Sequence, residues 1–239
     1  MTTMKKYVLA LGLGLCGAIG AKAQSPFISV IPEIGVQFSN MRAQTNGMES
    51  SGELKSGVRA GLAIDMALSN NVSLQPGIFY SKKGYEVEQD LLRNIGNNMY
   101  NEHRNTDVTV NYIEFPITLQ YKFSKGNTGG LFVGAGPYIG VAIDGDVEST
   151  VTRTLANSLS ESVAFSSNDE RDLRIGDDFG DDIESTDIGL NANLGYQFNN
   201  GFMLRGYTGI GLSNLAPNGN SNNSLRNFSF GFTLGYVIK

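Results

Sequence analysis

The sequence predicts an all-β fold, an eight-stranded antiparallel up-and-down β-barrel that crosses a membrane. Three observations predict it. Eight segments alternate apolar and polar side chains with a period of two, as a strand with one apolar and one polar face does. The connections between these segments are alternately long and short. The apolar faces carry no charge except Lys82 near one rim, whereas the polar faces carry small residues and charges of both signs.

Each segment is identified by an apolar residue at every second position. The first four in chain order are ISVIPEIGVQF (28–38), GVRAGLAIDMAL (57–68), VSLQPGIFYSKKG (72–84) and NYIEFPITLQYKFSK (111–125). The other four are LFVGAGPYIGVAI (131–143), DIGLNANLGYQF (187–198), FMLRGYTGIGL (202–212) and NFSFGFTLGYVIK (227–239). A tilted strand needs about ten residues to cross hydrocarbon, and each segment is long enough.

The connections indicate which face meets lipid. The short ones are 69–71, 124–128 and 199–200, and the long ones are 39–57, 85–108, 144–186 and 214–225. Short turns at one rim and long loops at the other are typical of outer-membrane barrels, which turn their apolar faces outward to lipid. A soluble β-sandwich with the apolar face inward is the alternative. Prolines inside four segments remove ladder donors, so we expect bulges or irregular ladder geometry at Pro32, Pro76, Pro116 and Pro137.

The N-terminus predicts export. Two lysines precede the apolar run YVLALGLGLCGAIGA, and the motif Ala-Lys-Ala then ends at residue 23, just before Gln24. This order is that of a secretory signal peptide. We therefore assign residues 1–23 to the signal and residues 24–239 to the barrel domain. The one cysteine, Cys16, leaves with the signal, so neither disulfides nor cysteine-bound metal can brace the mature chain.

The charge balance argues against nucleic-acid partners, which need a basic stripe. The pI is near 4.9, and loss of the three signal lysines takes the formal charge from −5 to −8. No mature segment approaches the roughly 18 consecutive apolar residues of a spanning helix. Membrane insertion would therefore depend on strands.

Charged residues on the polar faces predict a network inside the barrel. They are Glu33, Arg59, Asp65, Glu114, Lys122, Asp187 and Arg205. Eight strands enclose a space just wide enough for side chains, so we expect these charges to pair and fill it. A gated or ion-binding channel is the alternative interpretation.

Enzyme signals are sparse. The lone histidine, His103, falls in the second long connection, where a hydrolase would need a serine beside it. We expect a solvated histidine, no enzymatic activity and no cofactor.

The third long connection, residues 144–186, is strongly acidic. It holds twelve acids and three arginines, a net charge of −9. Such a segment buries little apolar surface, so we expect a mobile extracellular loop beside lipopolysaccharide. Within GDDFGDDIES, the carboxylates of Asp177, Asp178, Asp181 and Asp182 form a candidate site for a divalent cation, although the order differs from an EF-hand.

Six stretches carry a family resemblance: LQPGIFYSKKG, YIEFPITLQYKF, GPYIG, LGYQF, LRGYTGIGLSNL and FGFTLGYVIK. Together they resemble the small outer-membrane β-barrels of Bacteroidota described as "porin family protein" or PorT-like. The resemblance covers the mature chain and implies an eight-stranded barrel in the outer membrane, with an architecture like that of OmpX and the OmpA barrel. The prolines of QPG, EFP and GPY match the family's pattern.

These observations lead to one functional hypothesis and two alternatives. We expect a non-enzymatic outer-membrane anchor whose long loops serve envelope structure or surface interaction. The resemblance implies an alternative, an accessory of an envelope secretion or assembly system. A small barrel enzyme acting on lipid or peptide is a further alternative. The expected partners are outer-membrane lipid, lipopolysaccharide, the barrel assembly machinery and an unidentified surface or secretion protein.

Overall fold

The computed structural model describes residues 28–45, 48–96, 98–124, 129–155, 163–176, 178, 180–220 and 222–238. The predicted signal peptide lies outside the described residues. The described residues form ten strands: β1 (Ile28–Thr45), β2 (Met48–Ser51), β3 (Glu53–Ala67), β4 (Val72–Ile95), β5 (Asn98–Lys122), β6 (Gly130–Leu155), β7 (Val163–Asp172), β8 (Thr186–Gln197), β9 (Phe202–Gly211) and β10 (Asn223–Tyr236). The described residues include no helix that is long and apolar enough to span a membrane.

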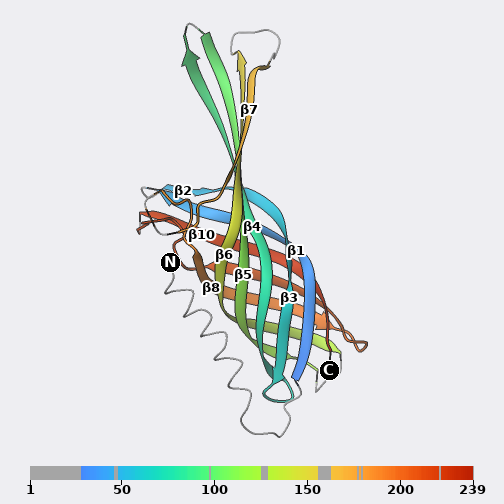
Figure 1. The fold of residues 1–239 in the computed structure, drawn as a ribbon. Coiled ribbons are helices and arrows are strands. Elements are labelled where there is room, and N and C mark those ends of the chain that lie inside the picture. The colour runs from blue at the N-terminus through green and yellow to red at the C-terminus, as the bar shows by residue number, and fades with distance from the viewer. Residues whose placement is uncertain are drawn as a thin grey trace.

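Eight of these strands form a closed antiparallel barrel (Figure 1). Neighbouring strands pair in the order β1, β3, β4, β5, β6, β8, β9 and β10, and β10 returns to pair with β1. The two others lie outside this ring, since β2 pairs with the end of β1 and β7 pairs with β6. The predicted fold is confirmed.

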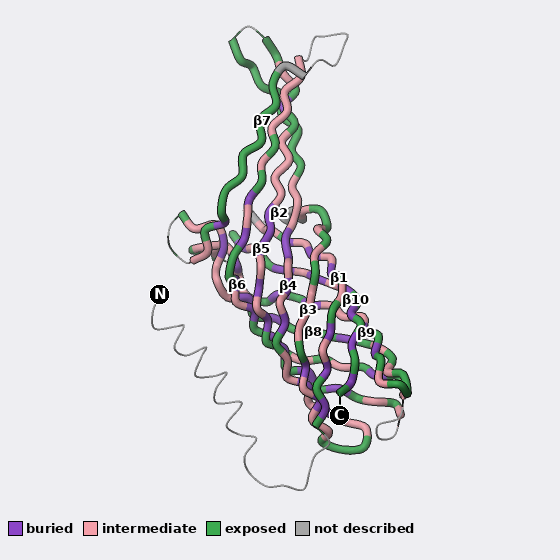
Figure 2. The backbone as a smooth tube through the Cα atoms, turned by 45° about the vertical axis from the view of Figure 1, so that its right-hand side comes forward, coloured by how far each residue is buried: buried purple, intermediate pink, exposed green. Residues whose placement is uncertain are grey.

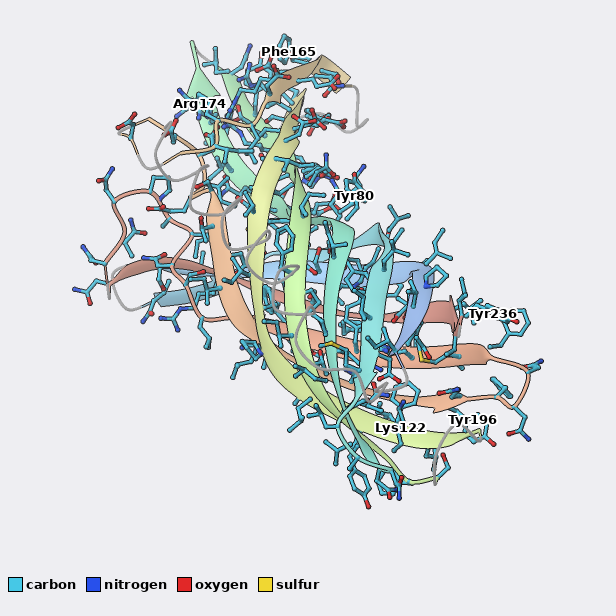
Figure 3. All side chains as sticks on the ribbon, turned by 60° about the horizontal axis from the view of Figure 1, so that its bottom comes forward. Tyr80, Lys122, Phe165, Arg174, Tyr196 and Tyr236 are labelled. Carbon is cyan, nitrogen blue, oxygen red and sulfur yellow. The ribbon has the colours of Figure 1, made fainter. Side chains whose placement is uncertain are left out.

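The apolar faces point outward, as the alternation predicts. In β5, Phe115, Ile117 and Leu119 are exposed on the outside, whereas Glu114 and Thr118 between them are buried. Aromatic pairs gather at the short-turn rim: Tyr121 with Phe123, Tyr196 with Phe198, and Phe202 with Tyr236. Figure 3 shows Tyr196 and Tyr236 at this rim and Phe165 at the opposite end of the molecule. An apolar exterior with an aromatic band suits a barrel in lipid.

Three of the four expected long loops are instead largely strands. In 39–57, β1 continues to Thr45, β2 follows, and β3 begins at Glu53. The upper parts of β4, β5 and β6 continue beyond the barrel and, with β7, form a four-stranded sheet that rises above one side of the rim (Figure 1). We call this sheet the fin and define it as residues 86–95, 98–107, 146–155 and 163–172. Its exposed residues dominate the upper part of Figure 2.

Most of the described part of 144–186 is therefore strand, where a loop was expected, and the expected mobility stays a prediction. Polar residues pair in the fin because both sheet faces meet water, so neither face needs to be apolar. The stretch VESTVTRTL, residues 147–155, also alternates β-branched valine and threonine, which favour strands. The β4–β5 register runs without a shift from Val72↔Tyr121 to Ile95↔Asn98.

No bulge lies at the four prolines, but the expected irregular ladder geometry is present beside Pro76 and Pro116. Register shifts occur instead between Leu54 and Arg59 in the β3–β4 pairing and between Asn111 and Tyr112 in the β5–β6 pairing. Beside Pro76 and Pro116 the ladder skips residues but resumes in the same register. The ladder is therefore interrupted where proline lacks an N–H donor, and no extra residue is inserted into either strand.

Candidate functional site

The lower half of the barrel interior holds a neutral group of four charges, which we call the lower ion group: Glu33, Asp65, Lys122 and Arg205. The Lys122 ammonium pairs with Asp65, and Arg205 Nη2 lies 3.2 Å from Glu33 Oε1. Gln75 connects the two pairs, because it donates to Asp65 Oδ1 at 2.9 Å and accepts from Arg205 at 2.9 Å. Thr233 donates to Glu33 Oε2 at 2.7 Å.

The upper half holds a second neutral group, the upper ion group: Arg59, Lys83, Glu114 and Asp187. The guanidinium of Arg59 pairs with Glu114. Lys83 Nζ lies 2.6 Å from Glu114 Oε1 and 3.2 Å from Asp187 Oδ2, so it bridges the two carboxylates. The Asp187 carboxylate also accepts hydrogen bonds from Tyr138 at 3.0 Å and Asn227 at 2.9 Å.

Aromatic rings pack against the lumenal cations. The Arg59 guanidinium lies 4.3 Å from the Phe79 ring centroid and 4.8 Å from that of Tyr207. Lys83 Nζ lies 5.2 Å from the Tyr112 ring and 5.0 Å from the Tyr138 ring. A cation over the face of an aromatic ring is attracted by the ring's negative charge density, and the attraction is stronger where water is excluded.

Apolar clusters occupy the two ends of the interior. At the short-turn end, the buried residues are Ile31, Ala63, Phe79, Phe132, Met203 and Val237. At the long-loop end, they are Met41, Val108, Val110, Tyr112, Ala142, Val147, Leu173, Ile183 and Leu215. Leu173, Ile183 and Leu215 come from the connections beyond the strands, and Glu184 N donates to Leu215 O at 2.9 Å. At the short-turn end the apolar cluster is interleaved with the lower ion group, because Lys122 is the cross-strand partner of Phe132 and Arg205 lies 5.4 Å from the Phe132 ring centroid.

The structure places all seven predicted lumenal charges inside the barrel and in ion pairs. Sequence reasoning missed an eighth, Lys83, whose side chain is almost completely buried. The signal was present, because Lys83 continues the inward positions Ser73, Gln75 and Ser81 by one step. With Lys83 included, the interior balances four acids against four bases.

The candidate cation site falls in the connection between β7 and β8. The Asp182 carboxylate accepts from Arg171 Nη1 at 2.6 Å and Nη2 at 2.9 Å, and from the Arg174 backbone N at 3.0 Å. The Arg171 hydrogen bonds hold the pKa of Asp182 well below its usual range. Asp177 lies outside the described residues. Within the described part, no three carboxylate, histidine or cysteine side chains form a metal-binding group. The cation site stays a prediction.

The two faces of the fin differ in charge. The face continuous with the outside of the barrel, here called the acidic face, carries Glu86, Glu88, Asp90, Asp107, Asp146, Glu148, Glu170 and Asp172. Glu86, Asp107, Glu148 and Glu170 are direct cross-strand neighbours, a row that raises the free energy of the isolated sheet. Lys55 from β3 pairs with Asp107.

The opposite face, here called the basic face, carries Arg93, Arg104, Arg153 and Arg171 against Glu102 and Asp169. Three arginines surround Glu102: Arg153 Nε at 2.7 Å, Arg93 Nε at 3.3 Å and Arg104 Nη2 at 3.4 Å. The hydrogen bond from Arg153 and the positive charges lower the pKa of Glu102. Arg153 also stacks on Phe165, at 5.0 Å from the ring centroid. One carboxylate cannot neutralise three guanidinium groups, so this face keeps positive charge.

His103 lies on the acidic face in β5, and its Nδ1 is 2.8 Å from Asp90 Oδ1. This hydrogen bond, with the charges of Asp90 and Glu88, raises the pKa of His103 above 6.5. Because the folded pKa is the higher one, the stabilisation is complete below the unfolded pKa and is lost as pH rises through the folded value.

An NMR titration of the His103 ring should therefore give a pKa above about 6.5, the ordinary value for histidine. Asp90→Asn should lower that pKa, while Asp107→Asn, which changes an acid farther along the same face, should move it less. An unchanged pKa in Asp90→Asn would mean that the pair does not form in solution.

One family model matches most of the chain. A family model described as "Outer membrane protein beta-barrel domain" matches residues 22–217. No curated protein matches the chain. Among solved structures, the attachment invasion locus protein Ail of Yersinia pestis is 12% identical, with 88% of this chain and 99% of that chain covered and a TM-score of 0.37. OprG of Pseudomonas aeruginosa is 12% identical, with 88% and 95% covered and a TM-score of 0.38. The outer membrane protease OmpT of Escherichia coli is 10% identical, with 92% and 99% covered and a TM-score of 0.35.

Proposed function

Because the chain belongs to the outer membrane protein β-barrel domain family and therefore lies in the outer membrane, we propose that it is a closed, non-enzymatic anchor that holds the fin outside the cell for contact with a surface partner. The filled interior carries this proposal. Outer-membrane lipid and lipopolysaccharide are the proposed surroundings of the barrel.

The interior leaves little room for a diffusing solute. The two ion groups neutralise their own charges, and the apolar clusters occupy both ends. In an eight-stranded barrel, side chains are large enough to fill the whole lumen. A transport role would need water-lined space, whereas these charges are paired and buried.

The fin supports the second half of the proposal. Its acidic and basic faces are both in water, and no apolar core requires it to stand above the rim. Binding residues are commonly displayed in this way on a rigid scaffold.

Planar-bilayer recording tests the closed anchor. Purified full-length protein should give no stable, high-conductance steps, while a sixteen-stranded porin reconstituted in the same bilayers should give them. Large, reproducible single-channel steps from this protein would contradict the proposal and favour a pore.

Truncation tests whether the fin is separable from the anchor. Residues 90–103 and 151–167 can be removed and replaced by two-residue turns at the pairs Gln89↔Arg104 and Thr150↔Asn168. The shortened protein should fold and insert, because the upper apolar cluster and every barrel pairing remain. Folding is measured by comparing the gel migration of heated and unheated samples, because a folded barrel migrates differently from the unfolded chain.

Deletion of residues 174–184 is the contrasting variant. It removes Ile183 from the upper apolar cluster and Asp182 from Arg171. It should lower the midpoint of thermal unfolding, whereas the truncated fin should leave the midpoint nearly unchanged. If the protein with the truncated fin does not insert, the fin is required for folding of the barrel.

A further inference from the structure

The fin has two free sheet edges within the described residues. The β3–β4 pairing ends at Glu53↔Glu86, so residues 87–95 of β4 pair with β5 on one side only. On the opposite edge, β7 pairs with β6 alone. We call these the β4 edge and the β7 edge.

Hydrogen bonds lower in β4 establish which backbone groups face the free side. Lys82 O accepts from Gln37 of β1, and Gly84 N and O both bond to Ser39 of β1. Backbone groups at even positions of β4 therefore point away from β5. Since the β4–β5 register has no shift, this direction persists along the strand. The N–H and C=O groups of Glu88, Asp90, Leu92 and Asn94 face the open β4 edge.

The β4 edge lacks most of the features that usually protect an edge strand. Proteins block such edges with proline, charged side chains such as lysine, bulges or very short strands. Residues 87–95 carry the charges of Glu88, Asp90 and Arg93, but they contain no proline and no lysine, and their pairing with β5 is regular. Leu91, Leu92 and Ile95 are 42%, 70% and 46% exposed. The same stretch borders a hollow of about 360 Å³ lined by Asp90, Leu91, Leu92, Asn101 and Glu102.

The β7 edge is protected in comparison. Its pairing with β6 has a register shift between Arg153 and Thr154, and its second half is the charged run Asp169–Asp172. By the same alternation, Gly145 O accepts from Leu173 N beyond β7, so even positions such as Asn168 face outward at this edge. The β7 edge therefore serves as a control for the β4 edge within the same molecule.

We propose that the β4 edge binds an extended segment of a partner protein as an added β-strand. This inference rests on the proposed display function and specifies its partner. Backbone hydrogen bonds to Glu88, Asp90, Leu92 and Asn94 supply the attachment, and alternate side chains supply selectivity.

The charges flanking the edge define the partner's sequence pattern. An added strand turns alternate side chains to the two faces of the fin. On the basic face they meet Gln89, Leu91 and Arg93, and on the acidic face they meet Glu88, Asp90 and Leu92. The matching antiparallel strand carries an acid opposite Arg93, apolar residues opposite the leucines, and bases opposite Asp90 and Glu88.

The probe is a fluorescent peptide, Thr-Glu-Val-Val-Lys-Thr-Lys, added to the full-length protein in lipid nanodiscs. Binding is measured by anisotropy. Leu92→Pro removes an outward N–H without removing a bond to β5, and it should weaken binding about tenfold or more. Asn168→Pro makes the same change at the β7 edge and should leave binding unchanged.

Two further arms test the backbone and the charge pattern. The same peptide N-methylated at both valines should not bind, because consecutive N–H groups face opposite edges of a strand and both are blocked. Arg93→Glu should weaken binding, and a probe with lysine in place of its glutamate should restore it. The N-methylated arm decides the question if Leu92→Pro does not fold.

Each outcome is decisive. Equal binding by Leu92→Pro and the unmodified protein, equal weakening by both proline variants, or binding of the N-methylated peptide overturns strand addition at the β4 edge. Absence of probe binding by the unmodified protein also overturns it. If strand addition fails in these tests, the absence of channels in bilayer recordings would still support the closed anchor. Failure of the inference and failure of the proposed function are therefore distinguishable.

Discussion

Replacing Lys83 by methionine should lower the free energy of unfolding of the barrel by about 3–5 kcal/mol. Lys83 is the cation that joins Glu114 and Asp187, and its side chain is 1% exposed. Without it, Asp187 keeps hydrogen bonds but loses its ion-pair partner, while Glu114 keeps Arg59. Leaving a buried carboxylate without its counter-charge destabilises the fold by far more than the intact ion pair stabilises it.

Lys82→Met provides the matched control, because this neighbouring lysine points to the outside and makes no ion pair among the described residues. Its effect should be within about 0.5 kcal/mol. Urea unfolding of folded protein in lipid vesicles measures both variants. Adding Asp187→Asn to Lys83→Met should recover part of the loss, since the unpaired charge disappears. Equal effects of Lys83→Met and Lys82→Met would show that the upper ion group contributes nothing to stability.

The barrel could be predicted from the sequence because alternation and rim asymmetry are local signals. A strand that separates lipid from a polar lumen must alternate, and residues 111–123 do so without a break. The lumenal charges followed from the same alternation. Lys83 lies inside the third predicted segment, 72–84, and was missed because the inward positions were followed only as far as Ser81.

The fin could not be predicted by the same means. A sheet with both faces in water has no apolar file, so its strands resemble polar loops. Its pairing is also non-local: β6 residues 146–154 pair with β7 only after a connection, and with β5 residues 101–109, which lie 37 to 53 positions earlier in the chain. Runs such as Thr150, Val151 and Thr152 suggest strands but do not identify their partners.

Apolar residues inside the barrel were also unexpected. Ile31, Phe132 and Met203 occupy inward positions on strands that also carry the lumenal polar residues, and all three are buried. A period of two separates the faces of a strand but does not say how the lumen is packed. Thr118 illustrates the consequence: a wet lumen would accept a charge there, yet Thr118 is 3% exposed and donates to Asn191 at 3.1 Å. It is therefore an unsuitable control for lipid-facing substitutions.

A pair of exposed leucines provides a better test of which surface meets hydrocarbon. Leu194 of β8 is 60% exposed on the barrel wall, and Leu92 of β4 is 70% exposed on the fin. Both leucines lie on strands and project outward, but only Leu194 should contact lipid. Their matched exposure means that a difference between arginine substitutions reports the surrounding medium.

Leu194→Arg should lower the free energy of unfolding by about 2–4 kcal/mol, the cost of a lipid-facing arginine near the bilayer midplane. Leu92→Arg should change it by about 0.5 kcal/mol or less, because the guanidinium stays in water. Refolding titrations into vesicles of phosphatidylcholine measure both. Vesicles with shorter acyl chains should reduce the cost of Leu194→Arg, since the guanidinium then reaches the interface more easily. Equal costs for the two substitutions would mean that the wall around Leu194 is not in contact with hydrocarbon.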